Sequence, residues 1–243
     1  SSVSTTALDA RWEAISVTES VRDAILDART ADEIHTYQNN IENCIGTVKI
    51  PVGIAGPLRV NGLFAQGDFY VPLATTEAAL VASYSRGAQL ITAAGGCSST
   101  LLDEGVSRAP GFAFHTIQES GKFSVWALSN IDEFRRVAEA TTAYGKLIDM
   151  QITLEGNHAY LNFEYHTGDA SGQNMVTIAT EEICAYIIEH TPIKPKYHFV
   201  EANLSGDKKA TYQSYLQVRG KRVSAEVTIP AALIEKVLHT TPA

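Results

Sequence analysis

Residues 147–165, LIDMQITLEGNHAYLNFEY, decide the fold that the sequence predicts. Residues 147–154 and residues 159–165 are rich in apolar and β-branched or aromatic side chains, which indicates two β-strands. The four residues between them, 155–158, include glycine and asparagine, which are typical of a tight turn. The sequence therefore predicts a β-hairpin, and the segments on both sides of it determine which sheet it joins.

The flanking segments complete a known order of elements. Residues 112–117 are strand-like, and residues 131–143 have the apolar spacing of a helix. After the hairpin, residues 172–189 predict a helix and residues 197–202 a strand. The resulting order, β-α-β-β-α-β, is that of a ferredoxin-like unit. We therefore expect an α+β protein in which a small domain, residues 110–200, interrupts a larger α/β body.

The larger body is expected to comprise residues 1–109 and 201–243. Residues 18–37 predict two short helices broken near Thr30, after a mobile N-terminal arm. Glycines and prolines between residues 43 and 72 favour turns and short strands.

A helix over residues 75–86 is predicted next, with Thr75 or Thr76 as its cap. Glu77 would then lie in the first turn, where the helix dipole favours a carboxylate. Residues 222–229 predict a strand and residues 231–238 a helix.

Composition excludes several classes of function. With 27 acidic and 19 basic residues the net charge is -8, so nucleic acid is not an expected partner. Cys44, Cys97 and Cys184 form no paired motif, which argues against a disulfide framework or a zinc site and favours a reducing cytoplasm. No apolar run approaches the roughly 18 residues that span a bilayer, so no membrane is expected for this segment. No metal site is predicted, and motifs of serine hydrolases and of Walker-type nucleotide sites are absent from the sequence.

Three segments combine polar side chains with glycine in apolar surroundings. Glu77 is either a dipole-compensating residue or a catalytic acid. The loop of residues 167–174 is either an ordinary strand-to-helix connection or a phosphate site formed by backbone N–H groups. Residues 207–209, Asp-Lys-Lys, are either a solvated turn or hold a lysine that stabilises an oxyanion. The basic residues at 219–222 fit either an exposed turn or contact with an anionic cofactor. Taken singly, these segments leave both readings open.

Taken together and in order, the segments resemble the hydroxymethylglutaryl-CoA reductases, in the class that includes the eukaryotic enzymes. The resemblance runs from about Ile41 to Thr241. It is carried by motifs that share the wording and order of that family: ENCIG at 42–46, PVGIAGPL at 51–58, VPLATTE at 71–77, LVAS at 80–83, SRG at 85–87, SRAP at 107–110, the loop at 168–174, DKK at 207–209 and RGK at 219–221.

The resemblance implies an oxidoreductase that converts 3-hydroxy-3-methylglutaryl-CoA to mevalonate and CoA by two hydride transfers, a step of isoprenoid precursor synthesis. It implies that the ferredoxin-like domain holds the nicotinamide cofactor, NADPH being expected and NADH left open. It also implies a homodimer or larger homo-oligomer, because the sites of this family lie between subunits.

The resemblance assigns roles residue by residue. Lys208 would stabilise the oxyanion that forms at the thioester carbon, and Glu77 would give a proton to the aldehyde oxygen. Arg108 and Lys209 would hold the glutaryl carboxylate. The remaining positions would face CoA (Ser83, Arg86), order the substrate site (Asn203, Asp207) or bind the cofactor (Asp169, Ser171, Gly172, Gln173, Asn174, with Lys146 near a 2′-phosphate).

The sequence departs from the best-known members at the places that carry these roles. The cofactor loop reads DASGQN at 169–174 where they have DAMGMN, and residues 201–203 read EAN where they have SGN. Glu201 thus replaces a hydroxyl expected to touch the substrate. Lys146 is the candidate substitute for an arginine that would meet a 2′-phosphate.

In the family, an aspartate and a histidine of the active site follow the part that matches this chain. We therefore expect a fragment of a complete reductase, inactive by itself. The alternative expectation is a catalytically incomplete relative that binds CoA or a nucleotide. A third is a relative that acts on another acyl thioester.

Overall fold

The computed structural model describes residues 3–38, 40–207, 210, 212–216 and 219–242. The chain forms two compact units. The first unit comprises Ser1–Leu58, Asp68–Ala93 and Ala231–Ala243, and the second comprises Arg59–Gly67 and Ala94–Pro230.

The N-terminal part of the first unit is helical, with α1 (Thr5–Glu13), α2 (Glu19–Ile25), α3 (Ala28–Glu33) and the 3-10 helix η1 (Ile34–Tyr37). The prediction of a mobile arm before residue 18 is wrong, because α1 is capped by Ser4 and buries Leu8 and Trp12. The indole of Trp12 donates a hydrogen bond to the carbonyl oxygen of Ile45 at 2.9 Å. The break between the next two helices lies at residues 26–27, where the Asp27 side chain caps α3.

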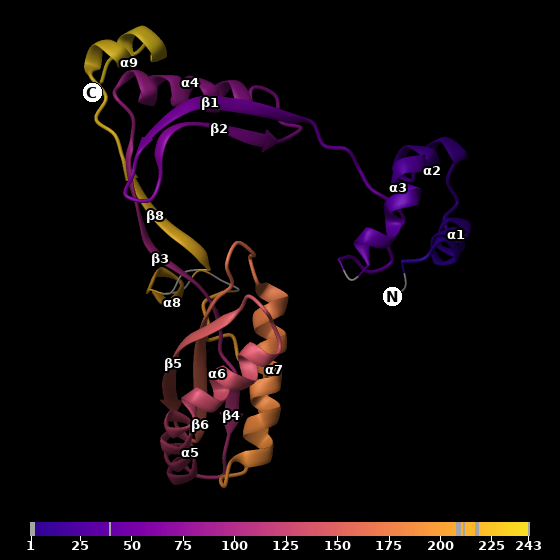
Figure 1. Cartoon of the computed structure of the whole chain (residues 1–243), viewed down its shortest axis with the longest axis vertical. Helices are drawn as coiled ribbons and strands as arrows, with labels where there is room; N and C mark the ends of the chain where they lie inside the picture. The colour runs from indigo at the N-terminus through magenta and orange to yellow at the C-terminus, as the bar shows by residue number, and fades with distance from the viewer. Residues whose placement is uncertain (1–2, 39, 208–209, 211, 217–218, 243) are drawn as a thin grey trace. The chain divides into compact units, whose positions relative to one another are not determined.

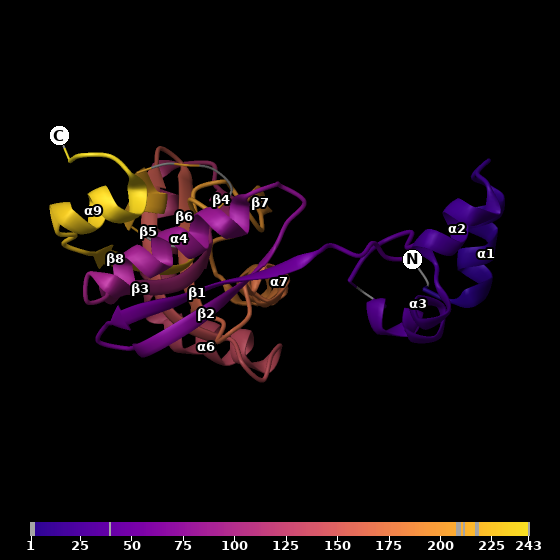
Figure 2. The same cartoon turned by 90° about the horizontal axis from the view of Figure 1, so that it is seen from above.

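The first unit also contains most of a β-hairpin, β1 (Val52–Asn61) and β2 (Gln66–Ala74), with α4 (Leu80–Ala93) along it and α9 (Ala231–Leu238) against α4 (Figures 1 and 2). Gly53 permits this packing, because a Cβ there would lie 2.8 Å from a methyl carbon of Val81. The predicted helix start at Thr75 or Thr76 is wrong. Ala79 has a left-handed backbone with φ 63°, so the helix begins after it.

The second unit is built on an antiparallel sheet with the strand order β7-β4-β6-β3-β8, and β5 pairs with β6. Its strands are β3 (Ser98–Arg108), β4 (Gly111–Ala113), β5 (Lys146–Glu155), β6 (His158–His166), β7 (Tyr197–Phe199) and β8 (Gly220–Glu226). The long strand β3 pairs with β8 along residues 98–105 and with β6 along residues 106–108. The last residues of β3 therefore enter the part of the sheet that the predicted hairpin, now β5 and β6, forms. That hairpin prediction is confirmed.

Helices α5 (Ile117–Ser129), α6 (Ile131–Ala140) and α7 (Gln173–His190) pack on this sheet (Figure 1), and α8 spans Tyr212–Leu216. The predicted helices at 131–143 and 172–189 are confirmed as α6 and α7. Sequence reasoning missed α5 and extended the preceding strand to residue 117, although β4 ends at residue 113. The signal was present, because Thr116 and Glu119 form a capping box at the start of α5.

An apolar core fills the space between these helices and the sheet. Phe134 makes edge contacts with Trp126, Phe163 and Tyr186 at centroid distances of 6.0–6.1 Å. Burial raises the pKa of the Cys184 thiol to about 12, so this cysteine behaves as an apolar residue. The apolar core comprises the buried residues Val106, Phe112, Phe114, Phe123, Ala127, Phe134, Ala138, Leu147, Met150, Ala159, Leu161, Phe163, Tyr165, Val176, Ala179, Ile183, Cys184 and Ile187.

The architecture is thus a mixed helix and sheet fold, which confirms the coarse class of the predicted α+β protein. Along the described residues, every helix falls short of the length and apolar character needed to cross a membrane.

Candidate functional site

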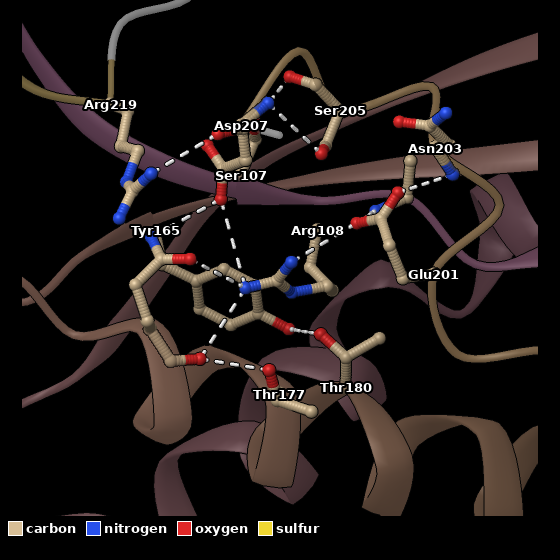
Figure 3. Close-up of polar contacts among 12 residues, drawn as sticks. Ser107, Arg108, Tyr165, Thr177, Thr180, Glu201, Asn203, Ser205, Asp207 and Arg219 are labelled. Atoms are coloured by element: carbon tan, nitrogen blue, oxygen red, sulfur yellow. Dashed lines mark hydrogen bonds and ion pairs between the residues drawn. The ribbon is translucent and has the colours of Figure 1, made fainter. Parts of the chain in front are cut away.

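Arg108 lies at the centre of a group of polar side chains at the end of β3, and it is 1% exposed. Its Nη1 donates to Glu201 Oε2 at 3.2 Å, and its Nη2 lies 3.7 Å from Asp207 Oδ2. Figure 3 shows the guanidinium with Glu201 and Asn203 on one side and Asp207, Ser107 and Arg219 on the other. We call Arg108, Gln173, Glu201 and Asp207 the polar centre. A buried guanidinium between carboxylates is a stable arrangement only while all of them remain paired.

Glu201 is held on both carboxylate oxygens. Besides Arg108, its Oε2 accepts from the backbone N–H of Ala109 at 3.3 Å, and its Oε1 accepts from the backbone N–H of Asn203 at 2.6 Å. Asn203 is exposed and has a left-handed backbone with φ 61°. The Glu201 carboxylate, at the position where the best-known family members have serine, therefore pairs with Arg108.

Asp207 is buried to 6% exposure and is fixed from several elements. Its N–H donates to Ser205 Oγ at 3.3 Å, while Ser107 Oγ donates to the Ser205 carbonyl oxygen at 2.8 Å. Arg219 donates to the carbonyl oxygen of Asp207 at 3.3 Å. Burial raises the pKa of the Asp207 carboxyl above its ordinary value, opposed by the hydrogen bond from Gln173 and by the nearby arginines.

Gln173 bridges the guanidinium and the Asp207 carboxylate. Its Oε1 accepts from Arg108 Nη2 at 3.2 Å, and its Nε2 donates to Asp207 Oδ2 at 3.3 Å. Its backbone carbonyl oxygen also accepts from Arg108 Nη2 at 3.4 Å. Gln173 is the first residue of α7, so the polar centre includes the start of this helix.

The loop before α7 is shaped by glycine. Gly168 and Gly172 have left-handed φ values of 63° and 69°, and Thr167 Oγ1 donates to the Ala170 carbonyl oxygen at 2.7 Å. A Cβ on Gly172 would lie 2.3 Å from a carbon of Thr167, so only glycine fits there. A hollow of about 240 Å³ is lined by Glu104, Gly105, Val106, Thr167, Gly168, Asp169, Ala170, Ser171, Gly220 and Lys221.

The structure places the predicted cofactor residues around this loop. Asp169 and Ser171 line the hollow, and Asn174 is exposed in the first turn of α7. Lys146 is paired across the hairpin with His166, directly before the loop. The Lys146 Nζ forms an ion pair with Glu139 Oε2 at 2.6 Å, and both groups are solvent-accessible. Lys221 contacts Glu104, its neighbour across β3 and β8, and both residues line the hollow.

Three predicted residues lie in the first unit. Glu77 is exposed in the turn before α4, where its N–H donates to Thr75 Oγ1 at 2.9 Å, so it is not in a first helical turn. Ser83 and Arg86 are exposed on α4. Ser83 borders a mainly apolar hollow of about 350 Å³ together with Ala55, Leu58, Val71, Tyr84, Gly87, Ala88 and Ile91.

Lys208 and Lys209 lie outside the described residues, and their assigned roles stay predictions. Of the other predicted residues, the structure brings Arg108, Gln173 and Asp207 together, with Asn203 beside them. Sequence reasoning missed the parts played by Ser107, Ser205 and Arg219. Ser107 and Arg219 belong to the SRAP and RGK motifs, which was the available signal.

Comparison with known proteins gives a consistent result. The family model described as hydroxymethylglutaryl-coenzyme A reductase matches residues 7–243. A 3-hydroxy-3-methylglutaryl-coenzyme A reductase from Pyrococcus abyssi is 46% identical over 204 residues, which cover 84% of this chain and 50% of the relative. The Aeropyrum pernix reductase is 42% identical over 223 residues, covering 92% of this chain and 52% of the relative. The chain thus spans about half the length of the curated relatives that it matches.

Solved structures agree on the fold. A 3-hydroxy-3-methylglutaryl-coenzyme A reductase from Streptococcus pneumoniae superimposes with a TM-score of 0.62 at 16% identity, covering 94% of this chain and 51% of that chain. A structure of the class II reductase from the same organism, bound to NADPH in open conformations, also has a TM-score of 0.62 at 16% identity, covering 94% of this chain and 58% of that chain.

Proposed function

The chain belongs to the hydroxymethylglutaryl-coenzyme A reductase family, and we propose that it takes part in the NADPH-dependent reduction of 3-hydroxy-3-methylglutaryl-CoA to mevalonate and CoA. The polar centre is the observation that carries the proposal. It joins the start of α7, directly after the glycine loop, to Asp207, the residue before Lys208. The resemblance assigns one of these segments to cofactor binding and the other to catalysis, and both contact the buried guanidinium of Arg108.

The proposal assigns residues 110–200 to a ferredoxin-like nicotinamide domain and the rest of the chain to substrate binding. Within residues 110–200 the strands follow the order β7-β4-β6-β5, with helices after the first and third strands in sequence. This agrees with the β-α-β-β-α-β order of a ferredoxin-like unit. The relative bound to NADPH supports the choice of cofactor.

The residues around the glycine loop fit a dinucleotide. The N-terminal N–H groups of α7 and the loop backbone offer donors to a phosphate. Lys221, which is paired with Glu104, lies in the same hollow as Asp169. Lys146 would meet a 2′-phosphate beside the loop. A bound nicotinamide supplies hydride in each of the two reductions.

The chain's own residues would supply charge and protons. Lys208 would neutralise negative charge on the thioester oxygen, and Glu77 would donate a proton to the aldehyde oxygen. Asp207, which faces Arg108, would orient the chain that continues into Lys208. Assembly of both catalytic groups from two copies of the protein in a homodimer is part of the proposal.

The test follows NADPH and NADH absorbance separately after addition of hydroxymethylglutaryl-CoA. Both this 243-residue chain and the longest native product that contains it are assayed. Lys208→Ala is expected to lower kcat by about 10²–10³-fold or more in the active form, while Lys122→Ala, an exposed lysine of α5, leaves it unchanged. Normal turnover by Lys208→Ala would overturn the assigned role. CoA binding without any oxidation would favour a binding-only relative.

The pairing of Glu201 with Arg108 favours a second candidate, reduction of another acyl-CoA. Arg108 faces two carboxylates already, so a glutaryl carboxylate would add a third negative charge. A CoA thioester of the same branching without that carboxylate avoids this repulsion. The two candidates separate by kcat/KM for both thioesters in the wild type and in Glu201→Ser. Under the second candidate, the wild type prefers the neutral thioester and the variant shifts toward the acidic one.

A further inference from the structure

Gln173 is the member of the polar centre that belongs to α7, and its amide contacts both charged neighbours. The guanidinium of Arg108 can only donate hydrogen bonds, and an ionised Asp207 can only accept them. The amide is uncharged and carries an acceptor and a donor on two separate atoms, so it can meet both neighbours at once. The methionine found at this position in the best-known family members offers neither of these bonds at comparable strength.

We propose that Gln173 is a positioning residue that couples the glycine loop before α7 to the segment carrying Asp207 and Lys208. This inference rests on the proposed function, because it deepens the roles of those two segments. Gln173 follows Gly172 directly, so any displacement of the loop by a bound dinucleotide moves the backbone to which the amide is attached. Asp207 is bonded to that amide and precedes Lys208.

Burial gives the coupling its strength. Arg108 and Asp207 are 1% and 6% exposed, so water cannot easily replace a lost amide bond. The groups that face Asp207 are Arg108 from β3, Gln173 from α7 and Arg219 before β8, and Glu201 approaches the same guanidinium. Removing the amide therefore takes away the hydrogen bond that links Asp207 to α7, while its contacts with Arg108, Ser205 and Arg219 remain.

The experiment compares Gln173→Met and Gln173→Glu in the longest native product. Gln118→Met, an exposed glutamine in the first turn of α5, is the matched control. We expect Gln173→Met to lower kcat about tenfold while KM for NADPH and for the CoA thioester stays within about threefold, because the lost hydrogen bonds are made to charged, buried partners. The control should equal the wild type.

Gln173→Glu gives a pH dependence of kcat that a simple loss of packing would not produce. At about pH 8 its carboxylate faces that of Asp207, so its kcat should fall below that of Gln173→Met. As the pH falls, one of the two carboxyls takes up a proton and donates to the other. The kcat of Gln173→Glu divided by the kcat of Gln173→Met should therefore rise. A pH-independent ratio, or a Gln173→Met variant within twofold of the wild type, would overturn the proposal.

If the wild type reduces no CoA thioester, the proposed function is wrong, but the coupling through Gln173 can still be tested. Thermal unfolding of the same proteins then tests the coupling. Gln173→Met should lower Tm by about 3 °C, and the Tm of Gln173→Glu should rise relative to it as the pH falls. Equal Tm values for Gln173→Met and wild type would overturn the proposal.

Discussion

The apolar core and the polar centre of the second unit share strands and helices but are stabilised by different forces. In the core, Phe134, Phe163 and Ile183 are fully buried and contribute free energy that depends mainly on area and volume. In the polar centre, each group is held by directed bonds to charged partners. The core should therefore accept substitutions that conserve volume, whereas the polar centre should fail on substitutions that conserve shape but change a donor or a charge.

The largest loss of unfolding free energy is expected when a buried ion pair, in contrast to an exposed one, is broken. Arg108→Met removes the cation that Glu201 and Asp207 share, and breaking a buried pair by removing one partner costs about 3–5 kcal/mol. Urea unfolding should show this loss in the free energy of unfolding. The control is Arg136→Met, whose exposed pair with Glu133 contributes about 0.5 kcal/mol. Equal losses in the two variants would erase the distinction.

A smaller effect is expected where a polar bond lies inside the apolar core. The hydroxyls of Tyr165 and Thr180 lie 2.8 Å apart and both residues are buried. Thr180→Val conserves shape but leaves the Tyr165 hydroxyl unpaired, which costs about 1–3 kcal/mol of unfolding free energy. Thr153→Val, at an exposed position of β5, should change it by less than about 0.5 kcal/mol. If the pair behaves like the apolar core around it, both valine variants will unfold at the same urea concentration.

The core was largely predictable because periodicity reports burial. The hairpin of β5 and β6 and the helix α7 follow from local patterns. Helix α5 was missed because its apolar periodicity is interrupted: Ser120 and Ser124 are buried beside Phe123 and Ala127, while Val125 and Leu128 are exposed. The two serine hydroxyls donate to backbone carbonyl oxygens, which permits their burial.

The polar centre was only partly predictable. The resemblance indicated Arg108, Asp207 and Gln173 as site residues, but no local pattern pairs residues that lie 65 and 93 positions apart in the chain. The partner of Glu201 depends on how β3 meets the segment after β7, which is a tertiary feature. The helix start at residue 75 failed for a local reason, the left-handed backbone of Ala79.

A carboxylate at the edge of the core gives a prediction about pH. Burial raises the pKa of Glu164 above 4.5, and Asp103 and Asp149 raise it further, while His166 acts in the opposite direction. A raised carboxyl pKa in the folded state destabilises the fold above that pKa and has no effect below the unfolded value. Glu164→Gln should therefore raise the urea midpoint at pH 7, and the gain should vanish as the pH falls toward 4.5. A gain that grows in acid would contradict this sign.

The smallest effect on stability is expected at Lys146, which lies beside the glycine loop and outside both the core and the polar centre. Its ion pair with Glu139 is exposed, so Lys146→Met should change the free energy of unfolding by less than about 0.5 kcal/mol. Its expected effect on the cofactor is larger, because removal of the ammonium group takes away an attraction that NADPH gains through its 2′-phosphate and NADH lacks. KM for NADPH should rise several-fold while KM for NADH stays nearly constant. The control is Arg135→Met, which removes an exposed cation of α6 and should leave both KM values unchanged. A parallel rise for the two cofactors would show that Lys146 does not meet the 2′-phosphate.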